Sequence, residues 1–298
     1  MRTEVIARPA NSYDRVDEAA SDKQTRTIQL DHGPLVFDVW GSLEHRSTDE
    51  LPLLLIHGWG GTGSYWESTA ATLSKSVPVI VPDLPGTGRS QPVAMAQNMF
   101  DQVRSLEALL DTLQVEKIQV VGHSMGSAMA LLLADSQRGR VQRLVLTALS
   151  FFVTEFEKQI YRTVMRVFRF SMAFRPQWLA SVPGMAQLMA HRYFYRVPDD
   201  PALLKQGLVD YLQLDAGTAA ACADDAPAKA IPEAGSRLQI PTLLVACRQD
   251  RVMPPHNVDY TANIIPDCEV VWIDECGHMP MLEKPHAYLA ILRDFLQL

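Results

Sequence analysis

The chain has 298 residues, of which 47% are hydrophobic and 20% are charged, and its formal net charge is −7. This composition is typical of a soluble globular protein. The length allows one large domain or two ordinary ones. The negative charge argues against nucleic acid as the main partner, and no apolar run approaches the length of a membrane span.

The N-terminal stretch 1–23 is polar and charged and has no apolar core of the kind found in signal peptides. We therefore predict a flexible arm there. Four cysteines, unevenly spaced, are too few for a disulfide framework, so reduced thiols in a cytoplasmic protein are expected. Either a monomer or a homodimer fits these features.

Short apolar runs alternate with helical patterns along most of the chain. Strands are predicted at 25–30, 35–40, 51–56, 77–81, 118–121, 141–147, 242–246 and 269–273. Helices are predicted at 64–75, 100–113, 127–134, 256–264 and 282–296. Continuous rather than alternating apolar strands indicate a sheet covered on both faces. The alternation predicts an α/β protein with an eight-stranded, mostly parallel central sheet flanked by helices.

Residues 150–237 interrupt this alternation. They contain helical patterns at 155–174, 183–195 and 201–214 and no good strand, and an Ala-, Asp- and Pro-rich stretch at 216–233 leads back to the core. We predict a helical cap at 150–237 inserted into a core formed by 24–149 and 238–298.

The segment from Gly122 to Gly126 reads Gly-His-Ser-Met-Gly and lies between a predicted strand and a predicted helix. In that context Gly-x-Ser-x-Gly predicts a nucleophile elbow, in which Ser124 is held in a strained turn above the strand ends. The flanking glycines leave room where strand and helix pass closely. The amide N–H of Met125 would point into the same space as the hydroxyl.

Other strand ends carry the partners that such a serine needs. The strand at 242–246 leads to Asp250, and the strand at 269–273 leads to Gly277 and His278. Ligands bind beyond the carboxyl ends of strands in such sheets, so these groups should converge. His278 would act as general base, and Asp250 would orient its imidazole. The backbone N–H groups of Trp59 and Met125 would form the oxyanion hole.

Several other residues compete for these roles. Asp274 lies near His278 but is interpreted as a loop acid, and Cys276 lacks an elbow. Asp83 and Arg89 are expected to brace a loop rather than to touch substrate. His57 and His123 belong to motifs, and we expect them to support loops by hydrogen bonding. No pattern with metal-ligand or dinucleotide spacing stands out, so neither a metal nor a cofactor is predicted.

The predicted cap carries a second signal. From Lys158 to Val197 there is no acidic residue, whereas basic residues alternate with aromatic residues and methionines. One interpretation is a lid with its apolar side over Ser124 and its basic side in water. The other is a surface that contacts a membrane or attracts anionic substrates.

Together these motifs resemble the α/β-hydrolase fold family, in its subgroup with an inserted helical cap. The resemblance spans residues 25–298 and includes His57-Gly-Trp-Gly-Gly61, the loop from Asp83 to Ser90, the elbow, Asp250 and Gly277-His278. It implies a cofactor-free serine hydrolase acting on a carboxylic ester, lactone or thioester through an acyl-enzyme. The Met- and aromatic-rich cap suggests that the substrate is a small, mainly apolar molecule. Hydrolysis of a C–C bond in a ring-cleavage-type diketone is the alternative. A perhydrolase and a small-molecule receptor on the same scaffold also stay open.

Overall fold

The computed structural model describes residues 23–43, 51–172, 175–253 and 255–298, and for 167–172 it describes the backbone alone. The predicted arm 1–23 lies outside the described residues except for Lys23, which begins the first strand.

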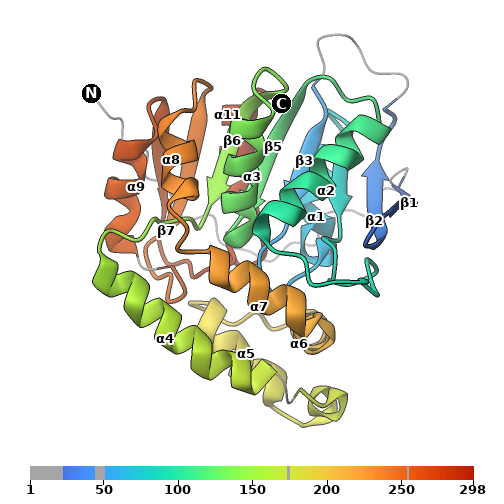
Figure 1. Ribbon diagram of the computed structural model, residues 1–298, viewed down its shortest axis with the longest axis vertical. Helices are drawn as coiled ribbons and strands as arrows, with labels where there is room; N and C mark the ends of the chain where they lie inside the picture. The colour runs from blue at the N-terminus through green and yellow to red at the C-terminus, as the bar shows by residue number, and fades with distance from the viewer. Residues whose placement is uncertain (1–22, 44–50, 173–174, 254) are drawn as a thin grey trace.

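An eight-stranded sheet, to which all the strands of the described residues belong, forms the centre of the molecule (Figure 1). Its spatial order is β1-β2-β4-β3-β5-β6-β7-β8. Only the β1–β2 and β2–β4 pairs are antiparallel. The five other pairs are parallel, which confirms the predicted mostly parallel sheet. The strands are β1 (Lys23–Leu30), β2 (Gly33–Trp40), β3 (Leu53–Ile56), β4 (Val79–Pro82), β5 (Ile118–His123), β6 (Val141–Thr147), β7 (Thr242–Cys247) and β8 (Cys268–Ile273).

Helices cover both faces of this sheet because the central strands are apolar on both sides. Along β3, Leu54 and Ile56 belong to one buried cluster, whereas Leu53 and Leu55 belong to another. The first cluster is covered by α2 (Met99–Thr112), α3 (Met125–Ser136), α8 (Ala230–Ser236) and α9 (Val258–Ile264). The second is covered by α1 (Glu67–Leu73) and α11 (Pro285–Leu296).

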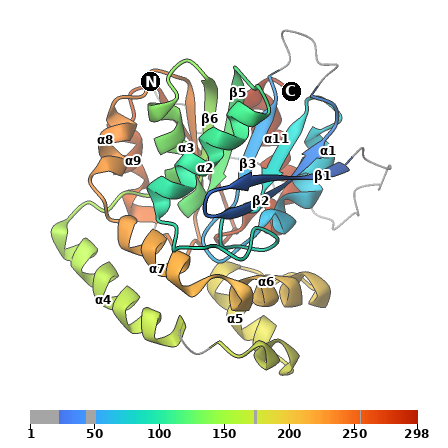
Figure 2. The same cartoon turned by 45° about the vertical axis from the view of Figure 1, so that its right-hand side comes forward.

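The chain between β6 and α8 holds a group of helices that lie together beyond the ends of the strands, below the sheet in the view of Figure 1 (Figures 1 and 2). They are α4 (Glu155–Met172), α5 (Met185–Tyr193), α6 (Pro201–Gln213) and α7 (Ala216–Asp225), with a short 3-10 helix at Gln177–Ser181. We call residues 148–229 the inserted segment. The limits of a separate cap domain stay a prediction.

Two local features differ from the sequence-based prediction. The stretch 216–233 contains α7 and the start of α8, because the Asp215 carboxylate caps α7 through the Thr218 N–H at 2.7 Å and alanines favour helix. The helix predicted at 282–296 is broken into α10 (Pro280–Glu283) and α11, because Lys284 is non-helical and Pro285 has no N–H to continue the helix.

None of the four cysteines, all of which lie in the described residues, forms a disulfide in the structure. Among the helices of the described ranges, none combines the length and the apolarity needed to cross a bilayer. The cytoplasmic location stays a prediction.

Candidate active site

Ser124 occupies the sharp turn between β5 and α3. Its φ of 54° and ψ of −121° lie outside the conformations that non-glycine residues normally adopt, which is the strained geometry predicted for a nucleophile elbow. The strain persists because the turn is held from both sides. The Ser124 N–H donates to the Thr147 carbonyl at 2.8 Å, and the Ser127 hydroxyl donates to the same carbonyl at 2.9 Å.

The glycines that flank this turn permit the backbone to pack closely. A Cβ on Gly122 would collide with the backbone of Gly126 and Ser127. A Cβ on Gly126 would lie 2.5 Å from the carbonyl oxygen of Ile56 on the neighbouring strand β3. Because these neighbours are main-chain atoms, neither site can relax to accept a side chain. The first turn of α3 is therefore brought directly against the sheet.

His278 and Asp250 form a buried pair. The imidazole Nδ1–H donates to Asp250 Oδ2 at 2.8 Å, and both side chains are almost fully buried. The other carboxylate oxygen, Oδ1, accepts the N–H groups of Val252 at 2.7 Å and Met253 at 2.9 Å. Asp250 therefore holds one tautomer of the imidazole and leaves its Nε2 atom free to accept a proton.

The residues that competed for these roles lie elsewhere. Asp274 has a side chain that is 54% exposed and forms an ion pair with Arg248 at 3.6 Å, so it does not contact His278. Cys276 is fully buried in the core cluster under α11 and is not part of the cavity wall.

A cavity of about 730 Å³ brings four of the five predicted site residues to one place, and the fifth, Asp250, lies outside its wall and contacts His278. Ser124, His278, Trp59 and Met125 all line it. Its wall is mainly apolar, and the inserted segment supplies much of it through Ile160, Tyr161, Val164, Met165, Met189, Tyr193, Leu203 and Tyr211. This volume lies in the usual range for sites that bind small molecules.

Sequence reasoning missed Tyr65, which joins the loop after β3 to the elbow. The Gly58 N–H donates to the Tyr65 hydroxyl oxygen, and this hydroxyl donates to His123 Nδ1 at 2.9 Å. The His123 Nε2–H then donates to the carbonyl oxygen of His278 at 2.9 Å. Burial, and next the nearby His278, hold the pKa of His123 well below its ordinary value, so the ring is neutral. No sequence signal distinguishes Tyr65 from the rest of its predicted helix.

His57 has a supporting role of the kind predicted. Its Nε2 accepts the Leu84 N–H at 2.9 Å and its Nδ1–H donates to the Gly58 carbonyl at 2.9 Å. Burial lowers its pKa, which keeps it neutral. It thereby ties the loop after β4 to the loop after β3.

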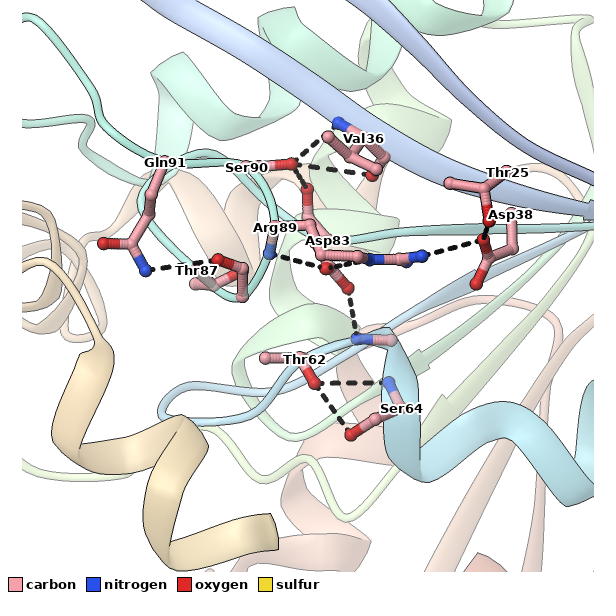
Figure 3. Close-up of polar contacts among 12 residues, drawn as sticks. Thr25, Val36, Asp38, Thr62, Ser64, Asp83, Thr87, Arg89, Ser90 and Gln91 are labelled. Carbon is pink, nitrogen blue, oxygen red and sulfur yellow. Dashed lines mark hydrogen bonds and ion pairs between the residues drawn. The ribbon is translucent and has the colours of Figure 1, made fainter.

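Asp83 and Arg89 brace the loop after β4 (Figure 3). Asp83 accepts the Gly63 N–H at 2.8 Å and the Arg89 Nε–H at 2.8 Å, and Arg89 also pairs with Asp38 at 2.8 Å. Neither Asp83 nor Arg89 lines the cavity. Their geometry agrees with the predicted loop-bracing role.

Helix α6 is anchored to the loop after β3 by Asp210, another residue that sequence reasoning missed. This buried carboxylate accepts the hydroxyls of Thr62 at 2.9 Å and Ser64 at 3.0 Å and the amide of Gln206 at 2.7 Å. Since Asp210 lies in the cavity wall, it fixes the inserted segment where the segment faces Ser124. Among the described residues, no cluster of three or more His, Cys, Asp and Glu side chains is arranged to hold a metal ion.

Comparison with known proteins agrees with this architecture. The model of the alpha/beta hydrolase fold family matches residues 52–285, and the chain therefore belongs to this family. It is a hydrolase by this relationship, and small-molecule substrates fit its relatives.

Two curated relatives and one solved structure illustrate the range of activities among the proteins that this chain resembles. The chain is 29% identical over 270 residues to the 2-hydroxymuconate semialdehyde hydrolase of Pseudomonas sp. (strain CF600), covering 85% of this chain and 89% of that one. It is 26% identical to a pimeloyl-(acyl-carrier protein) methyl ester esterase of Neisseria meningitidis, covering 82% and 92%. The structure of an esterase from Thermogutta terrifontis superposes with a TM-score of 0.73 at 25% identity, covering 92% and 98%.

Proposed function

We propose that this protein is a serine esterase that cleaves a carboxylic ester of a mainly apolar small molecule through an acyl-enzyme. Ser124 is the nucleophile, His278 the general base and Asp250 the residue that orients the imidazole. The observation that carries the proposal is the buried His278–Asp250 pair, 2.8 Å apart, in a cavity that Ser124 also lines.

The chemistry follows from these positions. His278 Nε2 takes the proton of the Ser124 hydroxyl as its oxygen attacks the carbonyl carbon of the ester. The negative oxygen of the tetrahedral intermediate accepts hydrogen bonds from the backbone N–H groups of Trp59 and Met125. His278 then gives the proton to the leaving alkoxide, and the acyl group stays on Ser124. Water, deprotonated by the same imidazole, attacks the acyl-enzyme and restores the serine.

The test combines active-site labelling with turnover. A fluorophosphonate should modify Ser124 with one label per chain, and a medium-chain p-nitrophenyl ester should give a burst of p-nitrophenol. Ser124→Ala should lose both while keeping its fold. Unlabelled wild-type protein that is nevertheless stabilised by a small ligand would contradict the proposal and favour a receptor.

The choice among related substrates rests on the cavity wall. The mainly apolar lining favours an apolar acyl or alcohol group, and it accommodates esters, lactones and thioesters alike. Measuring kcat/KM for a panel of p-nitrophenyl esters of graded chain length, with matched lactones and thioesters, would rank these substrate classes. Peroxide-dependent perhydrolysis can be measured on the same panel.

Hydrolysis of a C–C bond is the second candidate, supported by the similarity to 2-hydroxymuconate semialdehyde hydrolase. The same triad can support cleavage of a ring-cleavage-type diketone. Turnover of a dienoic ring-cleavage product without turnover of any ester would favour this function over the esterase.

We further propose that the inserted segment contacts an anionic lipid surface through α4. Phe156 is 73% exposed, and Ile160 and Val164 are exposed as well as lining the cavity. Arg162 and Arg166 are exposed on the same helix. An apolar stripe beside basic side chains is typical of helices that lie on a membrane, and here the stripe borders the cavity.

Flotation with vesicles tests this contact. Binding to phosphatidylglycerol vesicles should exceed binding to phosphatidylcholine vesicles and weaken as salt rises. Phe156→Ser should reduce it, whereas Met95→Ser, which changes a side chain 67% exposed outside the inserted segment, should not. If salt alters neither vesicle binding nor the KM for an anionic ester, the basic surface has no such role.

A further inference from the structure

The loop that carries His278 rests directly on the main chain of the inserted segment. The His278 N–H donates to the carbonyl oxygen of Tyr193, at the end of α5, at 2.6 Å. A Cβ on Gly277 would lie 2.6 Å from both the Tyr193 oxygen and the Tyr195 nitrogen. The two backbones therefore touch, and they can do so only because residue 277 has no side chain.

The carboxylate of Glu283 fastens this contact. Glu283 is the last residue of α10 and is only 6% exposed. Its Oε2 accepts the Gly277 N–H at 2.8 Å and the Tyr195 N–H at 3.2 Å, and its Oε1 accepts the Arg196 N–H at 2.7 Å. One buried charge thus joins the His278 loop to a segment more than 80 residues earlier in the sequence. Hydrogen bonds to a charged acceptor are stronger than neutral ones.

We propose that Glu283 is a positioning residue that fixes the His278 imidazole by fastening its loop to residues 193–196. This inference rests on the proposed role of His278 as general base. In this arrangement one residue, Tyr193, both forms part of the cavity wall and holds the loop of the proposed general base. The Tyr193 ring lines the cavity, its centroid is 6.2 Å from the centroid of the His278 ring, and its carbonyl holds the His278 N–H.

Replacing Glu283 by Gln tests the role with little change in size. The amide keeps one acceptor oxygen and places an NH₂ group where an oxygen accepted, so at least one of the three N–H groups loses its partner. A shift of the imidazole by about 1 Å is enough for a roughly 100-fold loss of rate. We expect kcat per fluorophosphonate-titrated site to fall by about 10- to 100-fold with KM nearly unchanged, since ester binding depends on the rest of the cavity.

The matched control is Glu275→Gln, which removes a half-exposed carboxylate of the same loop that pairs with the side chains of Arg196 and Lys284. It should keep wild-type kcat. A purely structural role for Glu283 predicts a lower melting temperature but an unchanged kcat per titrated site, and that result would overturn the inference.

If Glu283→Gln does not fold, a second variant and a measurement on the wild-type protein still test the inference. Arg196→Pro removes one N–H donor to Glu283, whereas Arg196→Ala keeps it, so only the proline variant should lose kcat. In the wild-type protein, the amide protons of Gly277 and Arg196 should exchange slowly and share one opening free energy. Fast exchange of either contradicts the fastening. Failure of fluorophosphonate to label the wild-type protein would instead refute the proposed function itself.

Discussion

The His123 imidazole donates a hydrogen bond to the main-chain carbonyl of His278 over 2.9 Å. The residue before the proposed nucleophile is thus tied to the residue proposed as its base. Because a carbonyl oxygen can only accept, His123 carries its proton on Nε2, and its Nδ1 must accept from Tyr65. Every donor and acceptor in this chain of bonds is thereby fixed.

Removing the Tyr65 hydroxyl should break this series of hydrogen bonds. In Tyr65→Phe the Gly58 N–H loses its acceptor and His123 Nδ1 loses its donor. We expect the free energy of unfolding to fall by about 1–3 kcal/mol, measured by urea denaturation. Tyr260→Phe, at a residue 40% exposed on α9, should change it by less than about 0.5 kcal/mol. Equal effects of the two variants would argue that the hydrogen bonds of Tyr65 do not stabilise the fold.

The buried histidines should make the fold sensitive to mild acid. Burial lowers the pKa of His57 and His123 in the folded protein below the ordinary value of 6.5. As pH falls through that value, the unfolded chain takes up protons that the folded chain does not, so stability is lost. The loss should be about 1.4 kcal/mol per pH unit for each imidazole, continuing until its folded pKa is reached.

Urea denaturation between pH 8 and 5 measures this slope. Stability should be flat above about pH 7 as far as these two groups are concerned, because both states are then neutral. His123→Asn should remove the part of the slope that His123 contributes, about 1.4 kcal/mol per pH unit. The part contributed by His57 and by the partly buried His32, whose pKa burial also lowers, should remain. A slope unchanged by the variant would show that other groups are responsible.

Asp250→Asn should remove catalysis while keeping the fold. The asparagine oxygen can still accept the N–H groups of Val252 and Met253, which places its NH₂ toward His278 Nδ1. The imidazole then carries its proton on Nε2 and cannot accept one from Ser124. We expect kcat to fall by about 10³- to 10⁴-fold. Asp274→Asn is the control and should stay near wild type; the reverse ranking would identify the wrong acid.

Gly126→Ala should prevent folding, because the new Cβ would lie 2.5 Å from the Ile56 carbonyl oxygen. Gly207→Ala, in the middle of α6 with nothing within 4 Å of its Cβ position, should instead stabilise the protein by up to about 1 kcal/mol. Thermal denaturation compares the two. A folded Gly126→Ala protein of normal stability would mean that α3 can move away from the sheet.

Much of the scaffold is predictable because its signals are local. The apolar runs that form β5, β6 and β7 and the pattern around Ser124 can be read within a dozen residues of sequence. Long-range partners cannot be found in this way. Glu283 contacts Arg196 across 87 positions and Asp210 contacts Thr62 across 148, and an isolated acidic residue gives no sign of which distant N–H or hydroxyl it will accept. Helix α7 was missed because an Ala- and Asp-rich stretch lacks the apolar periodicity on which the prediction depended.

The way in which the inserted segment joins the core determines how it could be exchanged. The segment begins after β6 and ends at α8, which packs on α3 and leads into β7. It therefore takes the place of a single loop in an otherwise regular β–α–β unit. Exchange of this one loop would therefore replace much of the cavity wall and leave the Ser124 turn in place. Any grafted replacement must nevertheless supply a main chain that meets Gly277, so its backbone is constrained at the positions of residues 193–196.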